Sequence, residues 1–292
     1  MRILILGSNG MVGSEISSKL NKIYELRSYD HSELDITDYD SIYNIVNQHK
    51  PNFIINSAAY TNVEKAEKNS TLCYEVNSDA VKNLAVLCNK FKSHLIHLST
   101  DYVFDGTKSI PYTENDATKP LNVYGDSKNK GDEYIKNSGC DYIIFRTSWV
   151  YGPNGNNFVK NILQKAILND KLEVVCDQYG SPTSSLFIAE IIEKYLNIQS
   201  LNNFTAPNEI FNLCPSGSTS WLNLADTALK HAHKINPKYK TNLVSIGSKQ
   251  YKTLAKRPKY SVLSNQKLST YFDIDIQNWE YYLKYFLDTY IN

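Results

Sequence analysis

A glycine-rich turn near the N-terminus places the strongest constraint on the fold of this chain. The apolar run Ile3-Leu4-Ile5-Leu6 has the character of a short buried strand, and Gly7, Gly10 and Gly13 follow it at once in the pattern G-x-x-G-x-x-G. Over residues 12–20 apolar side chains recur at helical spacing, which predicts a strand, a glycine loop and a helix in that order. Glycines at such a junction let the backbone approach a ligand, and the helix N-terminus offers unpaired N–H groups to an anion. The segment therefore predicts a site for a cofactor diphosphate.

The rest of the chain continues the alternation of strands and helices. We expect strands over 24–30, 53–56, 94–98 and 142–145, and helices over 38–49, 70–91 and 124–136. Parallel strands joined by right-handed helical crossovers give an α/β fold with a doubly wound parallel sheet over residues 1–150. Beyond it the alternation loosens, with helices expected over 158–168, 186–196, 221–231 and 279–290 and strands over 172–176 and 210–213. We interpret residues 151–292 as a smaller lobe, interleaved with the first and sharing a cleft with it.

Composition narrows the class of protein. The chain has 31 Lys and Arg against 30 Asp and Glu, so no basic excess points to nucleic acid or to an anionic membrane surface. No stretch approaches the roughly 20 apolar residues that span a bilayer, and the apolar start runs into the glycine loop without a signal cleavage site. Five cysteines without a C-x-x-C pair indicate reduced thiols, not a disulfide framework or a zinc site. We expect a cytoplasmic globular protein.

An aspartate marks the expected end of the second strand. Asp30 is placed to accept hydrogen bonds from an adenosine ribose, the alternative being a solvated turn residue. No Arg follows Asp30 to pair with a 2′-phosphate, but Arg27 and polar neighbours lie close enough to keep NADPH open beside NADH. Asp35 and Ile36 are further candidates to flank the adenine.

Tyr124 and Lys128 are the most informative pair of side chains. They are four residues apart at the start of an expected helix, so they share one helix face. An isolated phenol titrates at about pH 10, and a nearby ammonium group lowers that pKa, so the pair can exchange a proton with a substrate oxygen. In a chain with 22 tyrosines this pattern alone is weak. It gains weight because the preceding strand ends in Ser99, Thr100 and Asp101, at the sheet edge where doubly wound folds bind ligands.

With these residues in place, the chain resembles the extended short-chain dehydrogenase/reductase superfamily and, within it, the dTDP-4-dehydrorhamnose reductases. The likeness rests on motifs that run in family order over nearly the whole chain: GSNGMVG at 7–13, AAYTNVEKAE at 58–67, STDYVFDG at 99–106, PLNVYG at 120–125, FRTSWVYG at 145–152, DQYGSPT at 177–183 and RP at 257–258. Each motif is common by itself, but the combination is specific. The resemblance implies a Rossmann sheet with a smaller C-terminal substrate lobe.

The resemblance also implies a reaction. A 4-keto-6-deoxy sugar nucleotide, most closely dTDP-4-dehydro-β-L-rhamnose, would be reduced at its C4 ketone by NADPH or NADH to dTDP-L-rhamnose, a precursor of surface polysaccharide. Tyr124 would donate the proton, Lys128 would hold the nicotinamide ribose and tune Tyr124, and Thr100 would hydrogen-bond the sugar oxygen. With Tyr124 and Lys128, the cofactor-binding set comprises Gly7, Asn9, Gly10, Met11, Val12, Gly13, Asp30, Asp35, Ile36, Ala58, Ala59 and Tyr60.

Contacts with the sugar nucleotide are implied for Thr100, Asp101, Trp149 and Arg257. Arg257 either pairs with the nucleotide diphosphate or makes a surface salt bridge, and Trp149 either walls the sugar or belongs to the core. Glu15 and Glu190 match acidic positions that hold Mg²⁺ at a dimer interface in some members of the family. The tail lacks an obvious third acid at its end, so no metal ligand set is assigned, and Mg²⁺ and a homodimer stay open.

Two other functions stay open as alternatives. A sugar-nucleotide epimerase would share the fold and the Tyr124–Lys128 pair, but it would keep its nicotinamide bound and need no stoichiometric reductant. A regulatory subunit resembling that of methionine adenosyltransferase would be non-catalytic with similar motifs, although Trp149 and the full set of Thr100, Tyr124 and Lys128 favour an enzyme. A 4,6-dehydratase is disfavoured because such enzymes place a Glu where this chain has Tyr102 after Asp101.

Overall fold

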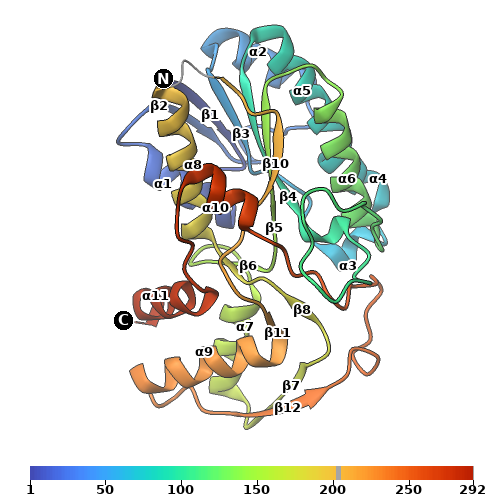
Figure 1. The fold of residues 1–292 in the computed structure, drawn as a ribbon, viewed down its shortest axis with the longest axis vertical. Coiled ribbons are helices and arrows are strands. Elements are labelled where there is room, and N and C mark those ends of the chain that lie inside the picture. The colour runs from blue at the N-terminus through green and yellow to red at the C-terminus, as the bar shows by residue number, and fades with distance from the viewer. Residues whose placement is uncertain (202–204, 292) are drawn as a thin grey trace.

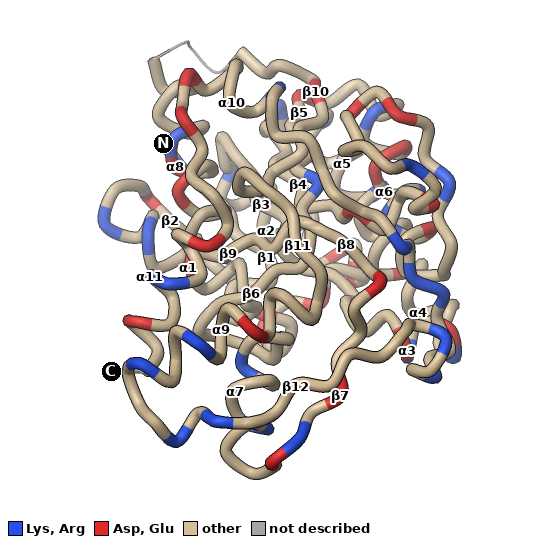
Figure 2. Tube along the Cα trace, turned by 60° about the horizontal axis from the view of Figure 1, so that its bottom comes forward, with Lys and Arg blue, Asp and Glu red and all other residues tan. Residues whose placement is uncertain are grey.

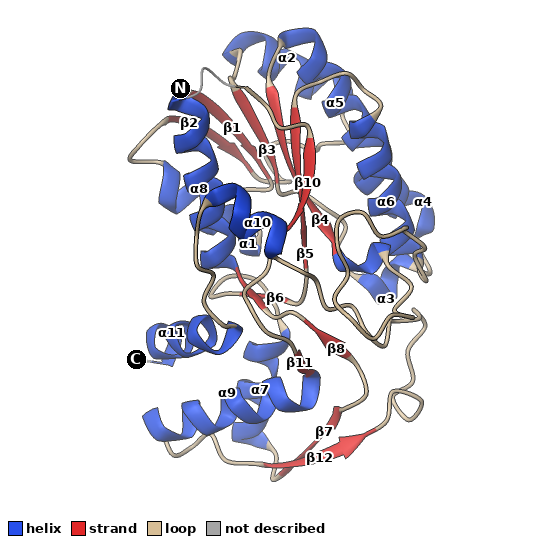
Figure 3. Ribbon diagram, in the orientation of Figure 1, coloured by secondary structure: helices blue, strands red, loops and turns tan. Residues whose placement is uncertain are grey.

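A six-stranded parallel sheet forms the centre of the protein in the computed structural model, which describes residues 1–201 and 205–291 (Figures 1 and 3). The strand order is β10-β5-β4-β3-β1-β2. Every neighbouring pair in this sheet is parallel. The predicted doubly wound sheet is therefore confirmed. Its strands are β1 (Arg2–Leu6), β2 (Glu25–Tyr29), β3 (Phe53–Asn56), β4 (His94–Thr100), β5 (Tyr142–Thr147) and β10 (Glu209–Asn212).

Helices cover both faces of the sheet because its strands are apolar on both sides. Along β1, Ile3 and Ile5 point into one core cluster and Leu4 and Leu6 into another, as the two-residue period of a strand requires. The first cluster lies under α1 (Met11–Leu20), α8 (Ser185–Leu201) and α10 (Gln266–Phe272). The second lies under α2 (Tyr39–His49), α5 (Ala80–Phe91) and α6 (Val123–Lys136).

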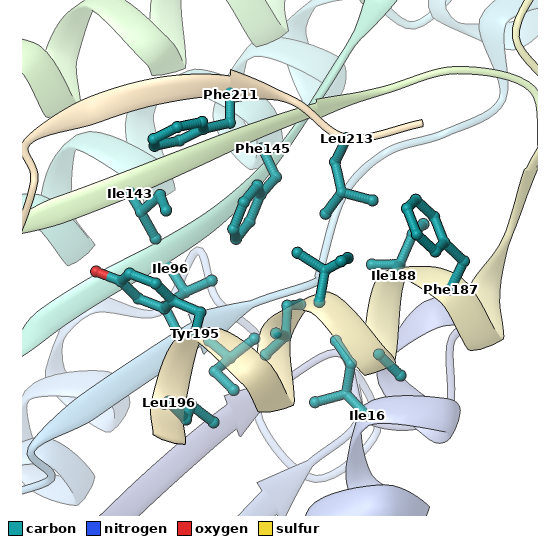
Figure 4. Packing of buried hydrophobic residues seen from close by; sticks show 14 of the residues in the cluster. Ile16, Ile96, Ile143, Phe145, Phe187, Ile188, Tyr195, Leu196, Phe211 and Leu213 are labelled. Carbon is teal, nitrogen blue, oxygen red and sulfur yellow. The ribbon is translucent and has the colours of Figure 1, made fainter. Parts of the chain in front are cut away.

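The first cluster joins early and late parts of the chain (Figure 4). Phe145 of β5 packs beside Phe211 of β10, and Tyr195 of α8 meets Phe145 edge to face, with ring centroids 6.3 Å apart in both pairs. Residues beyond 150 thus complete the edge and one face of the sheet.

A second group of elements lies beyond the carboxyl edge of the sheet, in the lower part of Figure 1. Its parallel strand pair packs with three helices around a separate apolar cluster. Two further pairs of two-residue strands connect this group to the sheet. These elements are α7 (Phe158–Leu168), β7 (Lys171–Val175), α9 (Trp221–Ile235), β12 (Asn242–Ile246) and α11 (Trp279–Ile291), with β6 (Val150–Tyr151) paired to β9 (Thr183–Ser184) and β8 (Tyr179–Gly180) to β11 (Thr219–Ser220).

The helix predicted over 70–91 is interrupted. It consists of α4 (Ser70–Tyr74), a π-helical turn η1 (Glu75–Asp79) and α5. The turn carries Asn77, a buried residue whose side-chain amide bonds both the N–H and the carbonyl group of Tyr60. The extra residue of the turn thus serves a polar contact to a neighbouring loop, a common use of π turns at functional positions. The α-helices and strands that were not predicted are α3 (Val63–Ala66), α10, β12 and the two-residue strands β6, β8, β9 and β11.

Charged residues of both signs are intermixed over the outside of the molecule (Figure 2). Among the helices of the described ranges, none has the length and apolar character needed to cross a bilayer. All five cysteines are free thiols.

Candidate active site

The glycine loop joins β1 to α1 at the carboxyl edge of the sheet. Gly7 has a φ of +80°, in the left-handed region, and a Cβ there would lie 2.7 Å from the amide nitrogen of Ala58. A Cβ on Gly13 would lie 2.1 Å from the carbonyl oxygen of Gly7. Helix α1 begins at Met11, and its N-cap residue Gly10 has no side chain to pair with the first N–H groups. The loop therefore fits an anionic group, such as a cofactor diphosphate, at the helix N-terminus.

Asp30 lies directly after β2, beside the glycine loop. Its carboxylate accepts hydrogen bonds from the N–H and hydroxyl groups of Ser32, at 2.7 and 2.6 Å, and from the side-chain amide of Asn9. The hydrogen bonds from Ser32, first that from its hydroxyl, lower the pKa of Asp30. Asp35 accepts from the N–H and hydroxyl groups of Thr37, while Ile36 is buried in the core. Asp30 is partly exposed and is tied to the glycine loop through Asn9.

The loop after β3 passes the same edge. Ala58 donates its N–H to the Asn56 side chain at 3.2 Å, and Tyr60 is held on both backbone groups by Asn77. These bonds fix Ala58, Ala59 and Tyr60 across from the glycine loop, where Gly7 touches Ala58.

Strand β4 delivers Thr100 and Asp101 to this edge. Asp101 opens a 3₁₀ turn, η2 (Asp101–Val103), and is almost fully buried. Its carboxylate accepts hydrogen bonds from the hydroxyls of Thr100, at 3.2 Å, and Ser148, at 3.0 Å. Burial raises the pKa of Asp101 to about 6, against these hydrogen bonds. The group is therefore ionised at neutral pH and changes charge just below it.

Tyr124 lies in the first turn of α6, which Asn122 caps through a bond from the N–H of Gly125. The phenol is hydrogen-bonded to the Thr100 hydroxyl, and its ring meets Tyr102 edge to face at 5.9 Å. Burial raises the pKa of Tyr124, and the bond with Thr100 opposes that rise. The sequence had suggested a lowered pKa. The difference arises because desolvation dominates and because Lys128 is engaged elsewhere.

Lys128 is buried, with 2% of its surface exposed. Its Nζ donates to the carbonyl oxygen of Leu98 at 2.6 Å and lies 3.1 Å from Nε2 of His97. Burial lowers the pKa of Lys128 to about 8, and the charge of Asp132 acts in the opposite direction. The amine is thus held against β4, the strand that also carries Thr100.

Arg257 of the C-terminal part and Trp149, which follows β5, are the two remaining predicted substrate contacts. Arg257 pairs with Glu64 at 2.5 Å and hydrogen-bonds the phenol of Tyr102. Trp149 has a φ of +48°, rare for a residue with a large side chain, and stacks on Trp221 with ring centroids 3.4 Å apart. A Cβ on Gly180 would overlap the Trp149 ring. Strain of this kind persists only where the surroundings enforce it, and it is common at ligand sites.

His97, Glu64 and Trp221 are among the residues of this region that were not predicted. His97 occupies an interior position of an apolar strand, where a polar side chain signals a partner. Glu64 lies in the motif AAYTNVEKAE at 58–67, where nothing in the sequence distinguishes it from the neighbouring acidic residue. Trp221 had been placed only as the start of a helix.

No group of three His, Cys, Asp or Glu side chains within residues 1–201 and 205–291 is arranged to hold a metal ion. Glu15 and Glu190 are both half-buried, and desolvation raises the pKa of each carboxyl. An open groove of about 710 Å³ beside β10 and α10, lined in part by Glu114, Phe211 and Lys267, contains none of the predicted site residues.

The doubly wound sheet, the glycine loop and the Tyr–Lys pair at its carboxyl edge define an oxidoreductase of the short-chain dehydrogenase/reductase class. Comparison with known proteins narrows the class. The family model described as RmlD substrate binding domain matches residues 1–292. A dTDP-4-dehydrorhamnose reductase of Aggregatibacter actinomycetemcomitans is 39% identical over 97% of both chains, and one of Burkholderia thailandensis is 34% identical over 96% of both. The chain belongs to the dTDP-4-dehydrorhamnose reductase family, as its motifs predicted.

Solved structures agree with this assignment. A dTDP-4-dehydrorhamnose reductase of Bacillus anthracis, in complex with NADP, is 32% identical with a TM-score of 0.92, covering 99% of both chains. The Clostridium acetobutylicum enzyme is 35% identical with a TM-score of 0.91 over the same share. A UDP-glucose 4-epimerase of Thermus thermophilus has a TM-score of 0.81 over 99% of both chains at 17% identity, a likeness of fold alone.

Proposed function

We propose that this protein reduces the C4 ketone of dTDP-4-dehydro-β-L-rhamnose to dTDP-L-rhamnose with NADPH or NADH. Family membership supports the reaction type. The observation that carries the proposal is the meeting of Thr100 and Tyr124 through a hydrogen bond, with Lys128 anchored on the adjoining carbonyl group of β4. The glycine loop, whose packing leaves no room for a Cβ at Gly7 or Gly13, supports a bound dinucleotide.

The chemistry follows from the positions of the side chains. A nicotinamide cofactor held by the glycine loop would supply a hydride to the C4 carbon of the sugar. Tyr124 would transfer its phenolic proton to the oxygen that gains negative charge, and Thr100, whose hydroxyl donates to Asp101 in the free protein, would turn that donor toward the same oxygen. A phenol with a raised pKa keeps its proton at neutral pH, so Tyr124 is ready as the acid. Lys128 donates to the nicotinamide ribose and stabilises the phenolate that remains.

The cofactor contacts in this proposal divide into three groups. Asn9, Gly10, Met11 and Val12, between Gly7 and Gly13, cradle the diphosphate. Asp30 binds the adenosine ribose, with Asp35 and Ile36 on the adenine side. The third group lies along the remaining length of the cofactor and consists of Ala58, Ala59 and Tyr60. NADP in the B. anthracis relative supports NADPH, while the ionised Asp30 supports NADH, so both reductants belong in the assay.

The substrate contacts come from both parts of the chain. Asp101 and Trp149 face the sugar, and Arg257 pairs with the diphosphate of the nucleotide. In this division residues 1–150 bind the cofactor and residues 151–292 mainly bind the substrate. A homodimer and a cytoplasmic location are further parts of the proposal.

The test is reductant stoichiometry. Purified protein should oxidise one NADPH or NADH for each dTDP-4-keto-6-deoxy sugar consumed. An epimerase would consume neither in net terms, and a non-catalytic subunit would leave both unchanged. Tyr124→Phe should nearly abolish turnover while cofactor still binds. Undiminished turnover by that variant would remove Tyr124 from the mechanism.

A further inference from the structure

His97 lies against Lys128 in the interior of the sheet and is fully buried. Its Nε2 is 3.1 Å from Lys128 Nζ, and its Nδ1 is 3.2 Å from the side-chain nitrogen of Asn56. Both ring nitrogens therefore face a nitrogen atom that carries hydrogens. A neutral imidazole has one N–H group and one lone pair, so it cannot accept hydrogen bonds from both neighbours.

The orientation of Asn56 decides which neighbour donates. Asn56 Oδ1 accepts a hydrogen bond from the N–H of Ala58 at 3.2 Å, so its NH₂ group faces His97 and donates to Nδ1. The ring proton is then on Nε2, directed at Lys128 Nζ. If Lys128 were an ammonium group, its N–H groups would face the Nε2–H of His97 with no acceptor between them. An uncharged amine offers its lone pair to His97 and still donates to the carbonyl oxygen of Leu98.

The charged groups around Lys128 are compatible with an uncharged amine. Burial and the proximity of Lys128 hold the pKa of His97 well below its usual value, so the ring is neutral. Asp132, one helical turn beyond Lys128 on α6, favours the ammonium form, but it is paired with Arg146 of β5 at 3.3 Å. The buried thiol of Cys73 on α4 acts in the same direction as Asp132. The other titratable side chains on α4, η1, β4 and α6 are Tyr74, Glu75, Asp79, His94, Tyr124, Asp126, Lys130, Glu133, Tyr134 and Lys136.

We propose that His97 favours the uncharged amine of Lys128 while the cofactor is absent, and that cofactor binding shifts Nζ to the ammonium form, with the proton taken from solvent. The second half rests on the proposed function, in which Lys128 donates to hydroxyls of the nicotinamide ribose. An ammonium group has three N–H donors, enough for Leu98 and two hydroxyls, and it needs no partner for a lone pair. His97 is in this sense a positioning residue, because it sets the proton content of the lysine that supports Tyr124.

Calorimetry of NADPH binding measures the proton directly. Titrations at pH 8.5 in two buffers of different ionisation enthalpy give the number of protons taken up. With a Lys128 pKa of about 8 in the free protein, the wild type should take up roughly three quarters of a proton. Ordinary histidines are already neutral at this pH and contribute little. An uptake indistinguishable from zero overturns the proposal.

Two substitutions at His97 show whether its ring favours the uncharged amine or the ammonium form of Lys128. His97→Gln keeps an N–H donor near the place of Nε2 and should retain the uptake. His97→Met removes the donor, so the ammonium form should persist to higher pH and the uptake at pH 8.5 should fall at least threefold. If the opposite tautomer held, with Nε2 accepting from an ammonium group, His97→Met would increase the uptake and refute the assignment.

A titration of the free protein separates this inference from the proposed function. Lysine labelled with ¹³C at Cε is followed by NMR from pH 6 to 11, and the Lys128 signal is assigned by its loss in Lys128→Met. Its midpoint should lie near 8 in the wild type and in His97→Gln, and higher in His97→Met if that variant folds. A wild-type midpoint at the ordinary lysine value, about 10.4, overturns the proposal. If this titration behaves as expected but NADPH does not bind, the proposed function fails while the assignment of His97 stands.

Discussion

Replacing Asp132 with asparagine tests what the buried ion pair between Asp132 and Arg146 contributes to stability. Asp132 is fully buried and Arg146 nearly so, with the Nε of Arg146 3.3 Å from a carboxylate oxygen that also accepts from Ser99 at 2.9 Å. Burial raises the pKa of Asp132 despite the nearby arginine, so desolvation outweighs attraction at this site. The pair is therefore not a large net source of stability. Removing one partner, however, leaves the other charge buried and unpaired, and this lowers the free energy of unfolding.

Asp132→Asn preserves shape and the bond from Ser99 but leaves the Arg146 charge buried without a counter-charge. Breaking a buried pair in this way costs about 3–5 kcal/mol, a large part of the 5–15 kcal/mol that typically separates folded from unfolded protein. At roughly 2–3 °C for each kcal/mol, the melting temperature should fall by about 6–15 °C. Adding Arg146→Met, which removes the second charge, should recover much of the loss.

Denaturant unfolding followed by circular dichroism gives the free energies. Asp226→Asn is the matched control, since Asp226 pairs with Lys230 at 2.6 Å on an exposed helix face, and its loss should cost less than about 1 kcal/mol. If Asp132→Asn costs no more than this control, or if Arg146→Met deepens the loss, the account of the buried pair is wrong.

Three shorter predictions concern the substrate side. Because the pKa of Asp101 is about 6 and its carboxylate accepts from Thr100, kcat/KM should fall as pH drops below 6, and Asp101→Asn should flatten that limb in a pH–rate profile. Arg257→Met should raise KM for the sugar nucleotide roughly ten- to a hundredfold if Arg257 binds the diphosphate. Glu64→Gln should then raise it far less, and equal effects in steady-state assays would mean that Arg257 only anchors its loop. Trp221→Leu, by removing the stack that holds Trp149, should raise KM roughly two- to twelvefold and red-shift tryptophan emission, whereas Trp221→Phe should retain most affinity.

The sheet could be predicted from the sequence because its signals are local. Each strand is a short apolar run bounded by polar turns, and each crossover helix shows its own period. The elements that were not predicted depend on distant partners. Strand β12 is only half-buried and pairs with β7, about 70 residues earlier in the chain, while α10 has seven residues, of which Leu268 and Phe272 contact the core. The π turn before α5 follows from the bond between Asn77 and Tyr60, which helical periodicity does not record.

The candidate site also has features that local sequence predicts and features that depend on distant contacts. The ends of parallel strands meet at one edge, so Thr100 and Tyr124 could be brought together from sequence. Strand alternation also places His97 and Ser99 on the side of β4 that faces α6, and helical spacing places Lys128 and Asp132 on one face of α6. Four polar groups were thus predictable as neighbours. Which of the four groups pair with each other could not be predicted, because the pairing depends on the height and tilt of α6 against β4. Those quantities come from packing along the whole helix, and they bring Lys128 to His97 and Asp132 to Ser99. The protonation state of Lys128, on which the proposed chemistry depends, is therefore a property of tertiary structure.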